Sequence, residues 1–217
     1  VDMRLRPSGS KGPVAASLSA FESYHRDSAW TWEKLALTRA RPVCGDPGLM
    51  NDLARAIRSA LAEPRDAEKV RADVVEMRKL MLKEQGSYGA WDVKRARGGL
   101  VELEFIAQTL QLIHAAAHPQ VLDTNTLAAL ARLQGAGLLS DADLAVLKRA
   151  ELLYHRLTQM LRLCLDGPYD PGKALPALNL LVANSAVCPD VATAEALLAE
   201  TQGEVAAIFD RLIGPAS

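Results

Sequence analysis

Two short stretches of this chain combine basic residues with backbone features that suit phosphate chemistry. The longer one, residues 92–111 (DVKRARGGLVELEFIAQTLQ), places Lys94 and two arginines before the pair Gly98 and Gly99. Glycines at a helix start let a ligand approach the first free N–H groups, and the helix dipole and neighbouring cations favour an anion there. The stretch therefore predicts a helix start that faces a phosphate or a metal, although a plain helix after a flexible loop with solvated charges fits the same residues equally well.

The residues after the two glycines form a helical pattern. Leu103, Ile106 and Leu110 recur at three- and four-residue steps, so they line one side of a helix. Glu102 and Glu104 fall in the first turns, where the helix dipole also favours carboxylates. The pattern therefore predicts a helix that begins near the glycines, has one apolar side and carries two acidic residues at its start.

The second stretch is the opening hexapeptide VDMRLR, in which apolar and charged residues alternate. That alternation predicts a half-buried strand with Asp2, Arg4 and Arg6 on its open face. An ion-pair ladder is the simpler explanation, and the alternative is a metal-binding carboxylate beside guanidiniums that bind phosphate. Turn residues follow, and a short return strand over residues 14–19 would complete a β-hairpin with Lys11 in its loop.

From residue 19 onward the sequence predicts helices separated by proline, glycine and capping residues. Ser19 opens a capping box, further helix-start signals occur at Asp46, Ser140 and Asp190, and the first helical segment has a break near Ser28. Leucine-rich apolar positions recur at helical spacing between these signals. The predicted fold class is therefore mainly α, a bundle of seven or eight helices behind an N-terminal β-hairpin.

Composition and charge bear on which classes of partner this chain is expected to bind. Hydrophobic residues make up 49% of the 217 residues, and the net charge of −1 gives no case for nucleic acid or a membrane surface. Charge is uneven, with seven basic and four acidic residues over 1–41, a net charge of +3, and −4 over 167–217. A positively charged N-terminal segment suits an anionic small molecule such as a nucleotide.

Three widely spaced cysteines argue against a disulfide framework and for a cytoplasmic protein.

Three motifs, taken in order along the chain, resemble one enzyme family. They are VDMRLRPSGSKG at the start, AWTWEKLALTRAR at residues 29–41 and GGLVELEFIAQ from Gly98 onward. Together they resemble the bifunctional glutamine synthetase adenylyltransferase/adenylyl-removing enzymes. The serine after RLRP and the wording AWTWE are more similar to the C-terminal, AMP-attaching half of these enzymes than to the other half. The resemblance covers residues 2–108, and the ordered set is far more specific than a Gly-Gly helix start alone.

This resemblance implies a nucleotidyltransferase palm followed by a helical domain. The predicted hairpin is then a remnant of the palm, so that residues 1–45 hold the end of the palm and the first helix and residues 46–217 hold the helical bundle. The implied reaction moves AMP from ATP to a tyrosine of glutamine synthetase with the help of Mg²⁺. The implied partners are glutamine synthetase and the PII signal protein.

The resemblance also implies roles for single residues. Asp2 matches the third carboxylate of the palm, a catalytic and metal-binding position. The family's first two carboxylates, in a Gly-Ser…Asp-x-Asp element, do not precede Asp2 in this sequence, so we expect the chain to be inactive on its own. The positions implied to bind the nucleotide are Arg4, Arg6, Lys11, Lys94, Gly98, Gly99, Glu102 and Glu104.

Two other functions fit parts of the sequence. The uridylyltransferase that modifies PII has a related palm and helical domain, although AWTWE and GGLVELEF favour the adenylyltransferase. A helical protein-interaction module without catalytic activity is the alternative from another class, because an Ala/Leu-rich bundle carries little chemistry of its own.

Overall fold

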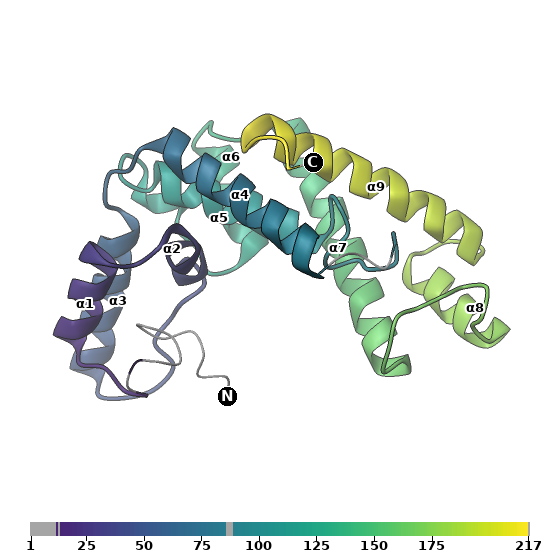
Figure 1. Ribbon diagram of the computed structural model, residues 1–217, viewed down its shortest axis with the longest axis horizontal. Coiled ribbons are helices and arrows are strands. Elements are labelled where there is room, and N and C mark those ends of the chain that lie inside the picture. Colours follow the sequence, from purple (N-terminus) through teal and green to yellow (C-terminus); the bar gives the residue numbers. More distant parts are fainter. Residues whose placement is uncertain (1–11, 13, 86–88, 217) are drawn as a thin grey trace.

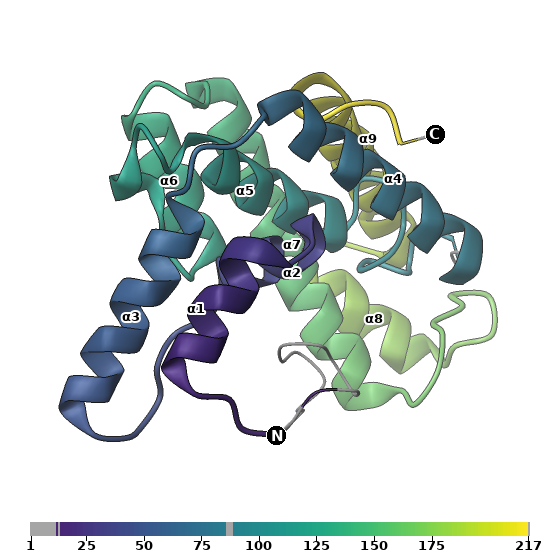
Figure 2. The same cartoon turned by 60° about the vertical axis from the view of Figure 1, so that its left-hand side comes forward.

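The chain folds as packed α-helices, and the computed structural model describes it over residue 12, residues 14–85 and residues 89–216. The mainly α class predicted from the sequence is confirmed. Figures 1 and 2 show the helices from two directions. Their bounds are α1 (Leu18–Asp27), α2 (Thr31–Leu37), α3 (Pro47–Leu61), α4 (Ala67–Gln85), α5 (Leu100–His114), α6 (Thr126–Gly135), α7 (Asp141–Cys164), α8 (Pro176–Ser185) and α9 (Val191–Leu212), with a short 3-10 helix, η2 (Pro119–Val121), after α5.

Helix α5 lies at the centre of the fold and packs against α2, α4, α6, α7 and α9 (Figure 1). The predicted apolar side is confirmed, because Leu103, Ile106 and Leu110 are all buried. Burial continues around the helix to polar residues such as Gln111, whose amide oxygen accepts the N–H of Asp123 at 2.8 Å. A helix that is covered on several sides must satisfy its polar side chains inside the protein.

Side-chain caps set several of the helix starts. Asp46, Ser140 and Asp190 each accept a hydrogen bond from the N–H three residues later, at 3.0, 3.1 and 2.7 Å, which confirms these predicted caps. The cap predicted at Ser19 is wrong. Ser17 caps α1 instead, because its backbone is extended and its hydroxyl accepts an N–H from the first turn at 3.2 Å, so the helix begins two residues earlier than the capping-box pattern indicated.

The predicted hairpin does not appear in the part of the chain that the structure describes. Residues 14–17 contain no strand and α1 begins directly after them, so the predicted return strand is wrong. The physical reason is the cap at the start of α1, which commits the following residues to a helix. The first predicted strand lies outside the described residues, and so do Asp2, Arg4, Arg6 and Lys11.

Helices α1 and α3 form a pair that projects from the main body (Figure 1). The break predicted near Ser28 is confirmed, since it separates α1 from α2. Only His25 of α1 is buried. Ile57 and Leu61 are buried near the C-terminal end of α3, whereas Leu49 at the start of the same apolar side is 53% exposed. The projecting pair is therefore packed on the body through one end only.

Two further observations concern the whole set of helices. Among the described helices, none combines the length and the apolar character needed to cross a membrane. Cys44, Cys164 and Cys188 are unpaired, as their spacing predicts.

Helix α8 ends at an unusual residue. Val187 has φ of +60°, in the left-handed region that β-branched residues rarely adopt. Its N–H donates to the carbonyl of Asn184 at 3.0 Å, and the N–H of Cys188 donates to the carbonyl of Ala183 at 2.9 Å, so the last carbonyls of the helix are satisfied. The side chain of Val187 is 76% exposed. The position therefore has the backbone of a helix-ending glycine but carries a valine.

We predict that Val187→Gly stabilises the protein by about 1 kcal/mol, because it relieves the left-handed strain and removes no buried side chain. Chemical denaturation with urea measures the change. Val43→Gly is the matched control, because Val43 is also exposed but lacks a positive φ. That substitution should lower the stability by increasing the freedom of the unfolded chain, and equal destabilisation by both variants would contradict the prediction.

Candidate functional site

The turn before α5, residues 92–99, holds most of the site residues predicted in the helical part of the chain. The backbone carbonyl of Asp92 accepts the N–H of Arg95 at 3.0 Å, and its carboxylate accepts Arg95 Nε at 2.8 Å. The carbonyls of Val93 and Lys94 accept the first two N–H groups of α5, at 2.9 and 3.1 Å. The turn is thus fixed by its own hydrogen bonds and caps the helix that follows.

Gly98 and Gly99 allow other parts of the backbone to approach closely. Gly98 has φ of +71°, and a Cβ there would lie 1.8 Å from the backbone oxygen of Gln202 in α9. A Cβ on Gly99 would lie 2.6 Å from the carbonyl oxygen of Val93. The N–H of Gly98 donates to Glu102 Oε2 at 2.9 Å. The expectation of free N–H groups here is therefore wrong, because chain carbonyls and a carboxylate already accept them.

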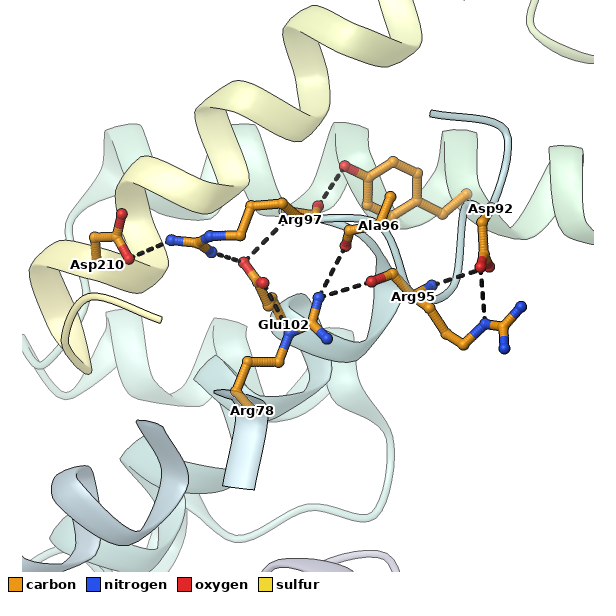
Figure 3. A network of polar contacts seen from close by, with 9 residues as sticks. Arg78, Asp92, Arg95, Ala96, Arg97, Glu102 and Asp210 are labelled. Atoms are coloured by element: carbon orange, nitrogen blue, oxygen red, sulfur yellow. Dashed lines mark hydrogen bonds and ion pairs between the residues drawn. The ribbon is translucent and has the colours of Figure 1, made fainter. Parts of the chain in front are cut away.

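Glu102 forms the buried centre of a network that holds this turn (Figure 3). Its side chain is fully buried, and Arg78 of α4, also buried, donates from Nε to Glu102 Oε1 at 2.8 Å. Arg78 Nη2 donates to the carbonyls of Arg95 and Ala96 at 2.7 and 3.1 Å. A buried carboxylate requires a charged partner with good geometry, and Arg78 supplies it while binding the turn itself.

Two other helices join the same network. Arg97 pairs with both Glu102 and Asp210, which ties the turn to α9 (Figure 3). The hydroxyl of Tyr154 in α7 donates to the carbonyl of Gly98 at 2.8 Å. Burial raises the pKa of Tyr154, and the negative charges of nearby glutamates add to this, so the hydroxyl stays a donor. The turn is therefore held from α4, α5, α7 and α9 at once.

On its outer side the turn lines a pocket of about 420 Å³, called the Lys94 pocket below. Lys94 and Arg95 come from the turn, and Arg162 comes from the C-terminal end of α7. Trp91 and Tyr169 also line it, and their rings meet edge to face with centroids 4.9 Å apart. The pocket thus places an aromatic wall beside three cations.

The charges of the Lys94 pocket favour an anion. Arg95 pairs with Asp92, whereas Lys94 and Arg162 are exposed and form no ion pair among the described residues. Asp166 is the other acidic residue in the lining. With Arg95 and Asp92 neutralising each other, two cations face one carboxylate, and phosphate oxygens are suitable ligands for both cations.

Glu104 does not line the Lys94 pocket. Its carboxylate forms an ion pair with Arg39 instead. Arg39 Nη1 donates to Glu104 Oε1 at 2.6 Å, which joins the AWTWEKLALTRAR motif to the GGLVELEFIAQ motif. Glu151 and His155 of α7 lie nearby, with Glu151 Oε1 3.5 Å from His155 Nε2. Burial raises the pKa of Glu151, and His155 opposes that rise. Two motifs that are far apart in sequence therefore meet on the surface of α5.

The structure thus divides those predicted site residues that it describes into three groups. Lys94 faces a pocket, and Glu104 joins the two motifs at a distance from that pocket. Gly98, Gly99 and Glu102 hold the turn together, and direct contact between them and a nucleotide stays a prediction.

Sequence reasoning missed three residues of this region. Arg78 had a signal, because it follows Val70 and Val74 at four-residue steps on the apolar side of α4, where an arginine needs a buried partner. Arg162 and Tyr169 had none, because they are distant from Lys94 in the sequence and only the packing of α7 brings them to it.

Family models match the chain in two overlapping parts. The model described as glutamate-ammonia ligase adenylyltransferase matches residues 1–56, which include the opening stretch and the AWTWE motif. The model described as GlnD PII-uridylyltransferase matches residues 52–170, which include the turn before α5 and the Lys94 pocket residues up to the loop after α7.

Curated relatives that share one name, bifunctional glutamine synthetase adenylyltransferase/adenylyl-removing enzyme, match nearly the whole chain. The relative from Rhodopseudomonas palustris (strain TIE-1) is 47% identical over 214 residues, 99% of this chain. Those from Xanthobacter autotrophicus (strain ATCC BAA-1158 / Py2) and Bradyrhizobium sp. (strain BTAi1 / ATCC BAA-1182) are 44% and 43% identical over 100% and 98% of it. The chain belongs to the glutamine synthetase adenylyltransferase family. It spans 22% of the length of each of these relatives.

Membership of the glutamine synthetase adenylyltransferase family confirms the resemblance carried by the three motifs. The match to the PII-uridylyltransferase model lies within the helical part of the chain. The helical segment is therefore similar to two kinds of nucleotidyltransferase, whereas residues 1–56 match the adenylyltransferase model.

We predict that Gly98→Ala destabilises the protein more than Gly137→Ala does. Both glycines have φ near +70°, so alanine costs about 1 kcal/mol of backbone strain at each. Only at Gly98 does the new Cβ meet another backbone, that of Gln202, which adds about 1–3 kcal/mol. Urea denaturation measures both values, and equal losses would show that Gly98 does not permit the close approach of α9.

We predict that Glu102→Gln lowers the free energy of unfolding by about 3 kcal/mol, because it leaves the charge of buried Arg78 without its carboxylate. Asp52→Asn is the matched control, since the Arg55–Asp52 pair is exposed and worth below about 1 kcal/mol. Thermal and urea denaturation of both variants provide the measurement. A loss at Glu102 no larger than that at Asp52 would rule out the buried pair as the support of the turn.

Proposed function

We propose that this chain forms part of an enzyme that transfers AMP from ATP to a tyrosine of glutamine synthetase, and that it corresponds to the AMP-attaching half. The proposal rests on 47% sequence identity, over 99% of this chain, to the Rhodopseudomonas palustris relative named bifunctional glutamine synthetase adenylyltransferase/adenylyl-removing enzyme. The serine after RLRP and the AWTWE motif support the assignment of this chain to the AMP-attaching half. The Arg39–Glu104 contact between two of the family motifs supports one shared site.

In the proposed reaction the tyrosine oxygen attacks the α-phosphorus of ATP. A phosphorus–oxygen bond forms to tyrosine, the bond to the β-phosphate oxygen breaks, and pyrophosphate leaves while the tyrosine proton passes to a base or to water. Asp2 polarises the tyrosine hydroxyl, and Arg4, Arg6 and Lys11 hold phosphates. Lys94, which lines a pocket with surplus positive charge, adds a cation from the helical side.

The proposed ligand of Mg²⁺ in this chain is Asp2, which lies outside the described residues. Within the described part of the chain no group of three His, Cys, Asp or Glu side chains is placed to hold a metal. Asp141 and Asp143 have an Asp-x-Asp spacing, but they begin α7. Asp143 accepts from the hydroxyl of Ser140 at 2.6 Å and pairs with Arg211 at 2.5 Å, so it is already engaged. The described residues therefore do not supply a magnesium site by themselves.

The proposed partners follow from the same relatives. Glutamine synthetase is the acceptor, as the names of the relatives say of those proteins. The PII signal protein as a regulator and a cytoplasmic location remain part of the proposal.

Transfer of UMP to PII is the second candidate function. It is favoured by the match of residues 52–170 to the GlnD PII-uridylyltransferase model. Because residues 1–56 match the adenylyltransferase model, we place it second. The two candidates differ in nucleotide and acceptor, so one assay with both pairs of reactants separates them.

We predict that Asp2→Asn lowers AMP transfer by roughly a hundredfold or more, because it removes a carboxylate from the metal and the reacting oxygens. The assay uses the Rhodopseudomonas palustris relative with its 214 matched residues replaced by this chain. Glutamine synthetase labelled from α-labelled ATP is the readout. Lys94→Ala should raise the KM for ATP about tenfold, because it removes one charge-assisted contact.

Lys148→Ala is the control for Lys94→Ala, because Lys148 is exposed on α7 and does not line the Lys94 pocket. Circular dichroism checks that each variant is folded. Near-normal labelling by Asp2→Asn would defeat the catalytic assignment, and an unchanged KM in Lys94→Ala would remove Lys94 from the site. The isolated chain should label nothing. Binding of glutamine synthetase by the replaced protein without labelling would favour an interaction module.

A further inference from the structure

A second cavity, larger than the Lys94 pocket, lies between α2 and α4. It has a volume of about 760 Å³ and is called the Trp30 pocket below. Val70, Met77 and Leu80 of α4 and Leu112 of α5 provide its apolar lining. The AWTWE motif forms the opposite side, and the proposed roles of Asp2 and Lys94 make no use of its tryptophans.

The two tryptophans of the motif are exposed although their backbone is firmly held. Trp30 is 71% exposed and Trp32 is 45% exposed. Glu33 fixes the start of α2, since its carboxylate accepts the N–H of Trp30 at 2.9 Å and the hydroxyl of Tyr24 at 2.6 Å. The hydroxyl of Thr31 donates to Asp73 of α4. The backbone that carries the two indoles is therefore fixed at the start of α2, and both tryptophans line the Trp30 pocket while remaining exposed.

Two partly buried cations line the same pocket as these tryptophans. Arg65 has a side chain only 10% exposed, and it donates to the carbonyls of Ala60, Leu61 and Glu63 at the end of α3. Lys34 forms no ion pair among the described residues. Burial lowers the pKa of Lys34, and the charge of Arg65 lowers it further, with Glu63 opposing both. The two cations thus repel each other, and an anion placed near Lys34 would relieve that repulsion.

Two of the four acidic residues that line the Trp30 pocket, Asp66 and Asp73, are engaged in hydrogen bonds or an ion pair. Asp66 caps α4 by accepting the N–H groups of Glu68 and Lys69 at 2.9 and 3.2 Å. Asp73 accepts from Thr31 and also pairs with Lys69 at 3.6 Å. Two further carboxylates line the pocket, at Asp27 and Glu76. Because these repel bare phosphates, a nucleotide that carries Mg²⁺ fits the lining better than one without it.

We propose that the Trp30 pocket binds a nucleotide, with the base stacked on the indoles of Trp30 and Trp32 and the phosphates directed toward Lys34 and the neighbouring Arg26. Exposed aromatic rings next to cations are the combination that binds a base and its phosphates together. The cavity and its side chains point to a nucleotide independently, and only the choice of an adenine nucleotide rests on the proposed function.

The experiment exploits the position of the three tryptophans of the chain. Trp30 and Trp32 line the Trp30 pocket, whereas Trp91 lines the Lys94 pocket. In Trp91→Phe the remaining tryptophan emission reports on the Trp30 pocket. In the double variant Trp30→Phe, Trp32→Phe it reports on the Lys94 pocket. The probes are ATP with and without Mg²⁺, and inorganic pyrophosphate, titrated into the 217-residue chain.

We expect MgATP to quench the emission of Trp91→Phe saturably and more tightly than pyrophosphate binds. Isothermal titration should show that Trp30→Ala weakens MgATP binding by roughly fivefold to a hundredfold, because it removes a stacking surface. Lys34→Met should weaken it about tenfold through loss of a charge-assisted contact. Lys148→Met on α7 and Leu163→Ala, an exposed leucine at the end of α7, are the matched controls and should bind normally.

Three outcomes would overturn the proposal. In the first, no MgATP binding is detected in a folded chain. In the second, binding changes only the emission of Trp91, which would place the nucleotide in the Lys94 pocket. In the third, pyrophosphate binds as tightly as ATP and Trp30→Ala has no effect, which would mean phosphate binding without stacking. The two proposals can fail independently. MgATP binding by the Trp30 pocket without labelling of glutamine synthetase would contradict AMP transfer but leave nucleotide binding by this pocket intact.

Discussion

The buried ion pair between Arg78 and Glu102 is the constraint on which the rest of this structure depends. Neither side chain has access to water, so the charge of each must be balanced by the other and by the groups around them. The remaining donors of Arg78 reach the backbone of the turn, and Arg97 connects the same carboxylate to α9. This arrangement connects the turn to α4, α5 and α9 at once.

The outward direction of Lys94 is a consequence of that constraint. Because the N–H groups, the glycines and Glu102 are all used inside the protein, the chemistry available to a ligand lies on the opposite side of the turn. There Lys94 and Arg162 stand beside the ring of Tyr169. The network therefore supports the site without being part of its accessible surface, as residues that position a binding group often do.

Motifs that are separated along the chain converge on α5. Arg39, near the end of the AWTWEKLALTRAR motif, contacts Glu104 in the middle of the GGLVELEFIAQ motif, and Leu112 of the same helix lines the Trp30 pocket. Both pockets are lined by tryptophan and by cations, a combination that suits nucleotides and fits a family of adenylyltransferases. Membership of that family explains why the order of the motifs was more informative than any one of them.

The sequence by itself determined the mainly helical class, the caps at Asp46, Ser140 and Asp190 and the buried side of α5, because these depend on spacing and on neighbouring residues. It also identified the family, since the motifs are short and contiguous. Only the tertiary structure decided that Gly98 serves the approach of α9, that Glu102 is buried and that Arg162 lines the same pocket as Lys94. These features depend on contacts between residues that are far apart in the chain, and local spacing carries no information about which distant backbone or charge will arrive there.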